Sequence, residues 1–166
     1  MYPPQNLGGF GICIERLAKG LEKIGYRLTV LTSDLPELGK TQKQSFIDRS
    51  LRLLGDYNNG VKHLEDKEER KKRSEHNKEV LRTVICNEMP DACLVGNLDL
   101  LGKELLDIMI DKNIPTIQHI GFMGSPFPGD WIPYDANFYI ACASGEVRRK
   151  LVSEGLKIEN HPVVYP

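Results

Sequence analysis

Apolar residues recur every three or four positions from residue 10 to residue 24, which predicts an amphipathic helix. Side chains at this spacing share one face of a helix. The stripe consists of Phe10, Cys13, Ile14, Leu17, Ala18, Leu21 and Ile24. Gly25 comes next and supplies the residue that commonly ends a helix. Residues 26–33, YRLTVLTS, are rich in β-branched and aromatic side chains and predict a buried strand.

The middle of the chain alternates between irregular and strongly charged segments. Residues 35–60 are polar and broken by proline and glycine, so we expect a long irregular segment with a short strand at RSLRLL. Residues 63–88 predict a helix whose first half, HLEDKEERKKRSEH, is highly charged. Such a run favours a solvated face with ion pairs one turn apart over a binding patch. The apolar second half is expected to pack on the core.

Strands and helices continue to alternate after residue 88. Helices are expected at residues 98–113 and 144–155, the latter with Ser144 as its N-cap and Gly155 just past its end. Strands are expected within residues 89–97, 114–121, 136–144 and 161–166. This alternation predicts a three-layer α/β fold, with a Rossmann-like parallel sheet and helices on both faces. We interpret residues 1–166 as a single domain.

The composition of the chain limits which cellular compartment and which kinds of binding partner we expect. The chain has 166 residues, of which 40% are hydrophobic, and 22 basic residues against 23 acidic ones give a net charge of −1. This balance gives no reason to expect nucleic acid as a partner, and membrane association would be at most peripheral. The sequence contains no apolar run of about 18 residues. Four widely spaced cysteines indicate small core residues in a reducing compartment, so we expect a cytoplasmic protein.

Candidate chemistry lies in the loops that follow the predicted strands, because ligands of parallel sheets gather at the carboxyl ends of strands. Gly8 and Gly9 precede a helix, where they could admit an anion or form an ordinary tight turn, and the residues alone favour the turn. His119 ends a strand and is equally consistent with ligand binding and with a structural role. No spacing typical of a metal site is present.

Three further polar or aromatic residues lie in these loops. Asn97 could bind a hydroxyl or serve as a turn residue, the latter being slightly favoured. Asp130 and Trp131 pair a carboxylate with an aromatic ring, which suits sugar recognition, although a lone tryptophan is more often a core or loop anchor. The basic run Arg148, Arg149 and Lys150 could approach an anionic acceptor or a lipid phosphate, but a solvated helix face is favoured.

Several segments together resemble family 4 glycosyltransferases, which are retaining, nucleotide-sugar-dependent enzymes of the GT-B type with two facing Rossmann-like domains. The likeness begins in YPPQNLGGFGICIERLAKGLEKIGYRLTVLTSD and continues in HNKEVLRTVICNEMPDACLVGN, IPTIQH, ASGEVRRKLVSEGL and HPVVYP. It covers nearly the whole chain in order and spacing, and residues 35–60 match loosely.

The resemblance implies roles for the candidate residues. Gly8, Gly9 and Phe10 would form the loop that approaches the donor diphosphate. His119 would be the catalytic residue in the cleft near the transferred sugar, and Asn97, Asp130 and Trp131 would bind the acceptor. It further implies a nucleotide-diphosphate sugar as donor substrate, with no metal or other cofactor.

Two departures from the family pattern indicate that the chain corresponds to only part of such an enzyme. The opening strand that precedes YPP in the family has no counterpart here, and neither the second domain nor its Glu-x-x-x-x-x-x-x-Glu donor element is present. We therefore expect the acceptor-binding N-terminal half of a glycosyltransferase, incomplete at its N-terminus and inactive alone. The alternative is a non-catalytic module that binds a sugar, a nucleotide or a protein and completes its sheet by oligomerisation through exposed strand edges.

Overall fold

The chain forms two compact units of mixed α/β structure. The structure is a computed structural model and describes residues 2–5, 9–35, 46–57, 60–96, 98–124 and 137–165. The first unit comprises residues 1–89 and 100–105, and the second comprises residues 90–99 and 106–166. The α/β class with parallel strands is confirmed, whereas one domain over residues 1–166 stays a prediction.

In the first unit, helix α1 and a parallel strand pair share a small hydrophobic core. The elements are α1 (Gly9–Lys23), β1 (Val30–Ser33) and β2 (Ile47–Leu51). Tyr2, Ala18 and Ile47 form the buried centre, and Ile14, Leu28 and Val30 pack against it. The predicted apolar stripe is therefore wrong at its end, since Ile24 is 72% exposed. The predicted strand is also shorter than residues 26–33, because pairing begins only where the Val30 N–H donates to the Phe46 carbonyl.

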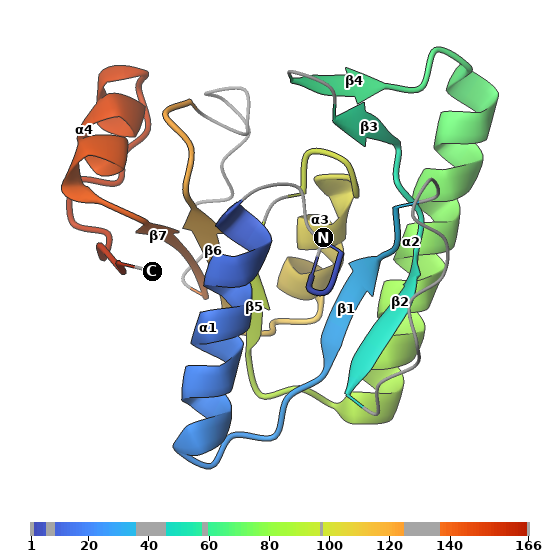
Figure 1. The fold of residues 1–166 in the computed structure, drawn as a ribbon, viewed down its shortest axis with the longest axis horizontal. Coiled ribbons are helices and arrows are strands. Elements are labelled where there is room, and N and C mark those ends of the chain that lie inside the picture. Colours follow the sequence, from blue (N-terminus) through green and yellow to red (C-terminus); the bar gives the residue numbers. More distant parts are fainter. Residues whose placement is uncertain are drawn as a thin grey trace. The chain divides into compact units, whose positions relative to one another are not determined.

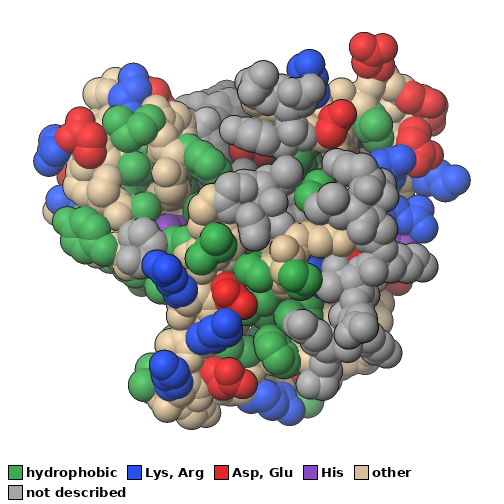
Figure 2. Space-filling view, in the orientation of Figure 1, with side chains coloured by type: hydrophobic (Ala, Val, Ile, Leu, Met, Phe, Trp, Pro, Cys, Tyr) green, Lys and Arg blue, Asp and Glu red, His purple; other side chains and the backbone are tan. Residues whose placement is uncertain are grey.

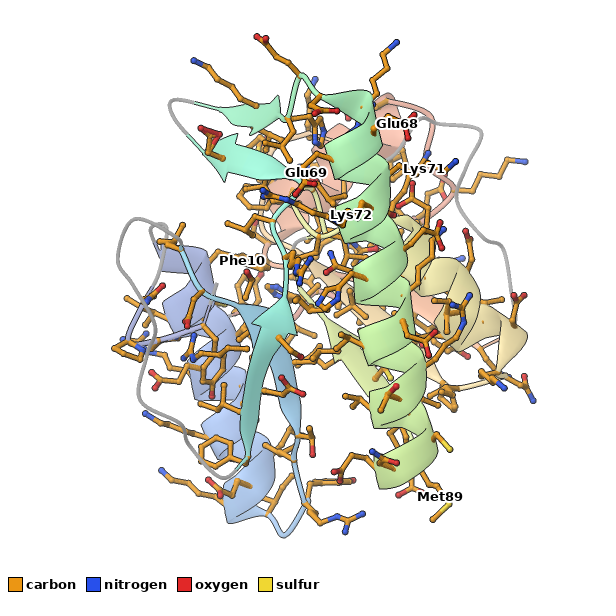
Figure 3. All side chains as sticks on the ribbon, turned by 90° about the vertical axis from the view of Figure 1, so that its right-hand side faces the viewer. Phe10, Glu68, Glu69, Lys71, Lys72 and Met89 are labelled. Carbon is orange, nitrogen blue, oxygen red and sulfur yellow. The ribbon has the colours of Figure 1, made fainter. Side chains whose placement is uncertain are left out.

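The rest of the first unit contains a hairpin and the longest helix. Strands β3 (Gly55–Tyr57) and β4 (Val61–His63) pair antiparallel, and β3 lies within residues 35–60, which we expected to be mostly irregular. Helix α2 (Lys67–Glu88) packs beside β2 (Figures 1 and 3). It begins four residues later than predicted, because the Asp66 carboxylate caps it by accepting from the backbone N–H groups of Glu68 and Glu69.

The charged half of α2 is a solvated face, as predicted. Glu69 and Arg73 form an ion pair at 2.8 Å, and Glu75 pairs with Lys78 at 2.9 Å. Figure 2 shows acidic and basic side chains intermixed where α2 begins. The hydrogen bond from Arg73 lowers the pKa of the Glu69 carboxyl. At the other end of α2, the exposed Met89 takes a left-handed backbone conformation (Figure 3).

The second unit is built on three parallel strands, β5 (Cys93–Val95), β6 (Thr116–Ile120) and β7 (Phe138–Cys142). β6 lies between the other two (Figure 1). Most of helix α3 (Glu104–Asp111) and all of helix α4 (Gly145–Ser153) belong to this unit. Its most deeply buried side chains include the polar Thr116, Gln118 and His119 as well as six apolar ones: Leu106, Ile120, Ile140, Leu151, Leu156 and Ile158.

The predicted ends of α4 are confirmed. The Ser144 hydroxyl accepts from the Val147 N–H at 3.1 Å, which caps the first turn. Gly155 follows the helix with φ of 98° and supplies the left-handed residue. The last predicted strand is reduced to a single bridge, in which Val163 runs parallel to Cys142 of β7.

Candidate functional site

The loop that precedes α1 is held at the carboxyl end of β1. Tyr2 and Gln5 are buried, and the Gln5 Oε1 accepts from the Leu35 N–H at 2.6 Å. On the other side, Arg49 of β2 donates to the carbonyl oxygens of Tyr2 and Pro3. Because a guanidinium holds several acceptors in a fixed plane, Arg49 fixes the course of this loop.

The position of Arg49 also determines the electrostatics of the loop. Its guanidinium lies 3.4 Å from the Asp34 carboxylate, and the Arg49 side chain is only 9% exposed. Burial raises the pKa of the Tyr2 hydroxyl, the charges of Glu15 and Glu22 raise it further, and Arg49 opposes them. Sequence reasoning missed Arg49 and Gln5, because nothing in the local sequence distinguishes them from surface residues.

The first turn of α1 offers amide groups and contains no acidic side chain of its own. Gly9 is the first residue of the helix, and the first turn contains no Asp or Glu. A Cβ atom placed on Gly9 would meet nothing within 4 Å among the described residues. Phe10 follows at the same end of the helix (Figure 3) and is partly buried. The first N–H groups of a helix have no intrahelical acceptor, so this end attracts an anion.

His119 lies in the second unit, near the carboxyl end of β6, and is 2% exposed. Its Nε2 is 3.1 Å from the Val164 carbonyl oxygen. Since a carbonyl oxygen only accepts, the imidazole donates its Nε2–H in this contact. Because the side chain is almost fully buried, a sugar could reach the ring only after a rearrangement. The catalytic role of His119 stays a prediction.

Other predicted site residues fall outside the described part of the chain. They are Gly8 of the donor-phosphate loop and Asn97, Asp130 and Trp131 of the acceptor site. The described residues that follow β6 include Phe122 and Met123, which are 40% and 53% exposed.

His161 and Arg148 have structural roles that the sequence did not indicate. The His161 Nδ1 accepts from the Ile140 N–H at 3.0 Å, and its ring centroid lies 6.2 Å from that of Tyr139. Arg148 donates to the His161 carbonyl at 2.9 Å. Arg149 and Lys150 are exposed, as expected for a solvated face, whereas Arg148 is only partly exposed and bonds the His161 carbonyl.

We expected all four cysteines to be small core residues, and this expectation is wrong for Cys86. Cys13 and Cys142 are buried, Cys93 is partly buried and Cys86 is exposed. Burial raises the pKa of the Cys93 thiol to about 11 and also raises those of Cys13 and Cys142. These three groups are therefore kept in the neutral thiol form at neutral pH.

The described residues contain neither a cluster of metal-binding side chains nor a helix that could span a membrane. No three His, Cys, Asp or Glu side chains come together there as a metal-binding group. None of the helices in this part of the chain has the length and apolar character needed to cross a bilayer. Comparison of the chain with models of protein families, with curated proteins and with solved structures gave no match.

Proposed function

We propose that this chain is the acceptor-binding half of a retaining glycosyltransferase of the GT-B type, with a Rossmann-like sheet. The whole enzyme would transfer a sugar from a nucleotide-diphosphate donor to a hydroxyl acceptor. Sugar and acceptor would meet beside the loops that follow the strands, with domain closure excluding water. The basis is the ordered resemblance of the chain to family 4 glycosyltransferases together with the geometry at the start of α1.

The observation that carries the proposal is the anchored loop before α1. Gln5 and Arg49 hold the loop from both sides, and α1 then begins at Gly9 with no acidic residue in its first turn. This arrangement favours the negative charge of a diphosphate, because the N-terminus of a helix carries a partial positive charge. Gly9 lacks a side chain, which leaves room for a ligand to approach the backbone.

His119 would act after a rearrangement of the C-terminal segment. Its Nε2–H now donates to the Val164 carbonyl oxygen. If that segment withdrew, the same N–H could donate to a sugar hydroxyl or to developing negative charge. Asn97, Asp130 and Trp131 are the proposed acceptor contacts, and no metal is required in this scheme.

The test is a titration of the isotopically labelled full chain with UDP-glucose, GDP-mannose and ADP-glucose, followed by NMR. We expect weak binding of at least one donor, with shifts confined in the first unit to the amides of residues 9–12. Gly9→Asp should weaken this binding several-fold, because it places a carboxylate where the diphosphate binds. Gly9→Ala is the matched control and should retain most of the affinity.

The Gly9→Asp variant also distinguishes a loss of donor binding from a loss of folding. An acidic residue in the first turn of a helix stabilises it by about 0.3–1 kcal/mol, so Gly9→Asp should unfold at the same or higher denaturant concentration. Equal affinity of Gly9→Asp and the unmodified chain would contradict the diphosphate site. Sugar transfer by the purified chain alone would contradict its assignment as an acceptor-binding half.

A further inference from the structure

Asp34 comes directly after β1 and is tied to the loop that leads into α1. Its carboxylate lies 3.4 Å from the Arg49 guanidinium. The same guanidinium donates to the carbonyl oxygens of Tyr2 and Pro3, which belong to that loop. Within the first unit, α1 begins and β1 ends on the same side (Figure 1). One arginine therefore holds a carboxylate beside the segment that precedes the helix.

The contact with Arg49 orients the Asp34 carboxylate and leaves it within reach of a ligand. A carboxylate offers about four acceptor positions, and the Arg49 N–H uses one of them. The Asp34 side chain is 19% exposed, whereas that of Arg49 is 9% exposed. A carboxylate alone would repel a neighbouring phosphate, and the positive charge of the guanidinium offsets this repulsion. Asp34 can therefore lie close to a bound diphosphate.

The order of the elements suits one kind of ligand. In nucleotide-binding α/β sheets, phosphates lie at the start of a helix, and an acidic residue after the following strand accepts from a ribose hydroxyl. In this chain, α1, β1 and Asp34 follow one another in the same order. Two neighbouring hydroxyl groups suit a carboxylate, because its two oxygens can accept from both at once.

We propose that Asp34 binds a vicinal diol of the ligand whose diphosphate lies at the start of α1. The carboxylate accepts from the hydroxyl groups, and Arg49 keeps it in place. In a nucleotide-diphosphate sugar, a diol stands on each side of the diphosphate, one in the ribose and one in the transferred sugar. This inference rests on the proposed function, because the diphosphate site of that proposal locates the diol.

The experiment compares ligands that differ in their hydroxyl groups. The labelled full chain is titrated with inorganic pyrophosphate, with UDP, GDP and ADP, with the 2′-deoxy forms of these three, and with UDP-glucose, GDP-mannose and ADP-glucose. NMR follows the amides of residues 9–12 and of Leu35. The same titrations are run on Asp34→Asn, which removes the charge and one acceptor oxygen. Asp56→Asn is the matched control, because it removes the same charge from an exposed position in β3.

The two sources of the diol give different results. If the ribose binds, the 2′-deoxy forms should bind the unmodified chain about tenfold more weakly than their parents, and this difference should vanish in Asp34→Asn. If the transferred sugar binds, Asp34→Asn should weaken the nucleotide sugars about tenfold and leave the nucleoside diphosphates unchanged. In either case, Asp34→Asn should bind pyrophosphate at least as tightly as the unmodified chain, because a negative charge is lost. Asp56→Asn should match the unmodified chain throughout.

Other results separate this inference from the proposed function. Unchanged affinity of Asp34→Asn for all nucleotides and nucleotide sugars would overturn the inference and leave the diphosphate site in place. A parallel loss of pyrophosphate binding would also overturn it, because Asp34 would then act only through the fold of the loop. No shift at residues 9–12 with any probe would overturn both.

Folding of the variant is checked by chemical denaturation. If Asp34→Asn does not fold, the unmodified chain decides the question. A lower affinity after loss of the 2′-hydroxyl or of the hexose would support the diol contact. Equal affinity for pyrophosphate, the nucleoside diphosphates, their 2′-deoxy forms and the nucleotide sugars would overturn it.

Discussion

The side chain of Asn77 in α2 binds both backbone groups of Arg52. Its Oδ1 accepts from the Arg52 N–H at 2.8 Å, and its Nδ2 donates to the Arg52 carbonyl at 2.8 Å. The same Nδ2 donates to the Leu101 carbonyl at 2.9 Å, and the residue is fully buried. One amide thus joins α2 to the segment after β2 and to the chain near residue 101, where neither segment forms regular secondary structure.

Replacing Asn77 should strongly destabilise the chain. Asn77→Ala would leave buried donors and acceptors of Arg52 and Leu101 without partners, and we expect the free energy of unfolding to fall by about 3 kcal/mol. Chemical denaturation followed by circular dichroism measures this change. Asn87→Ala on the exposed face of the same helix is the matched control, with an expected effect within about 0.5 kcal/mol.

An Asn77→Asp variant tests whether the acceptor oxygen of the amide is enough for stability without its N–H donors. It keeps an acceptor for the Arg52 N–H and loses both donors, and it buries a charge. It should be at least as destabilised as Asn77→Ala. A near-neutral effect of either substitution would contradict the network.

Arg49 should be required for the order of the N-terminal loop. Arg49→Lys retains the charge but not the planar set of donors to Tyr2 and Pro3, so we expect a loss of about 1–2 kcal/mol in unfolding free energy. Hydrogen exchange of the Gln5 N–H, and of the Leu35 N–H that donates to the Gln5 side chain, should accelerate. Arg52→Lys is the control, because the Arg52 side chain is exposed, and it should leave exchange in that loop unchanged.

Substitution by alanine should change the free energy of unfolding in opposite directions at two glycines. A Cβ atom on Gly55 would lie 2.0 Å from the Lys62 carbonyl oxygen, whereas one on Gly20, inside α1, would meet nothing within 4 Å. Gly55→Ala should therefore lower the free energy of unfolding by about 1–3 kcal/mol through the forced shift of the hairpin. Gly20→Ala should raise it by about 0.5–1 kcal/mol, because alanine is the better helix former.

Denaturation curves of the two single variants and of the double variant measure both effects. The two sites should behave additively, because they lie in separate elements. A stabilising Gly55→Ala would contradict the close packing of β3 on β4.

Cys93 should make the stability of the chain fall at high pH. Burial raises the pKa of its thiol from 9.0 to about 11. Below pH 9 the thiol is protonated in both the folded and the unfolded chain, and its contribution to the free energy of unfolding is fully present. Between pH 9 and pH 11 only the unfolded chain loses the proton, so stability decreases by at most about 1.4 kcal/mol per pH unit from this group.

Unfolding free energies measured from pH 8 to pH 11 test this sign. Cys93→Ala should flatten the decline, whereas Cys86→Ala should leave it unchanged, because the Cys86 thiol is exposed. A decline that persists in full in Cys93→Ala would assign it to other groups, such as the buried Tyr2, whose pKa is also raised.

Local sequence determined those features whose causes lie within a few residues. The α/β alternation, the end of α1 at Gly25, the Ser144 cap, the Gly155 terminator and the ion pairs of α2 were all predictable. Caps, left-handed glycines and contacts one helical turn apart involve neighbours in sequence, so the pattern of residue types suffices to find them.

Tertiary structure alone decided the features that depend on distant partners. The start of β1 depends on Phe46, the loop before α1 depends on Arg49, and the hydrogen bond of the His119 Nε2 depends on Val164. In each case one residue satisfies a polar group many positions away, and its type does not reveal which group that is.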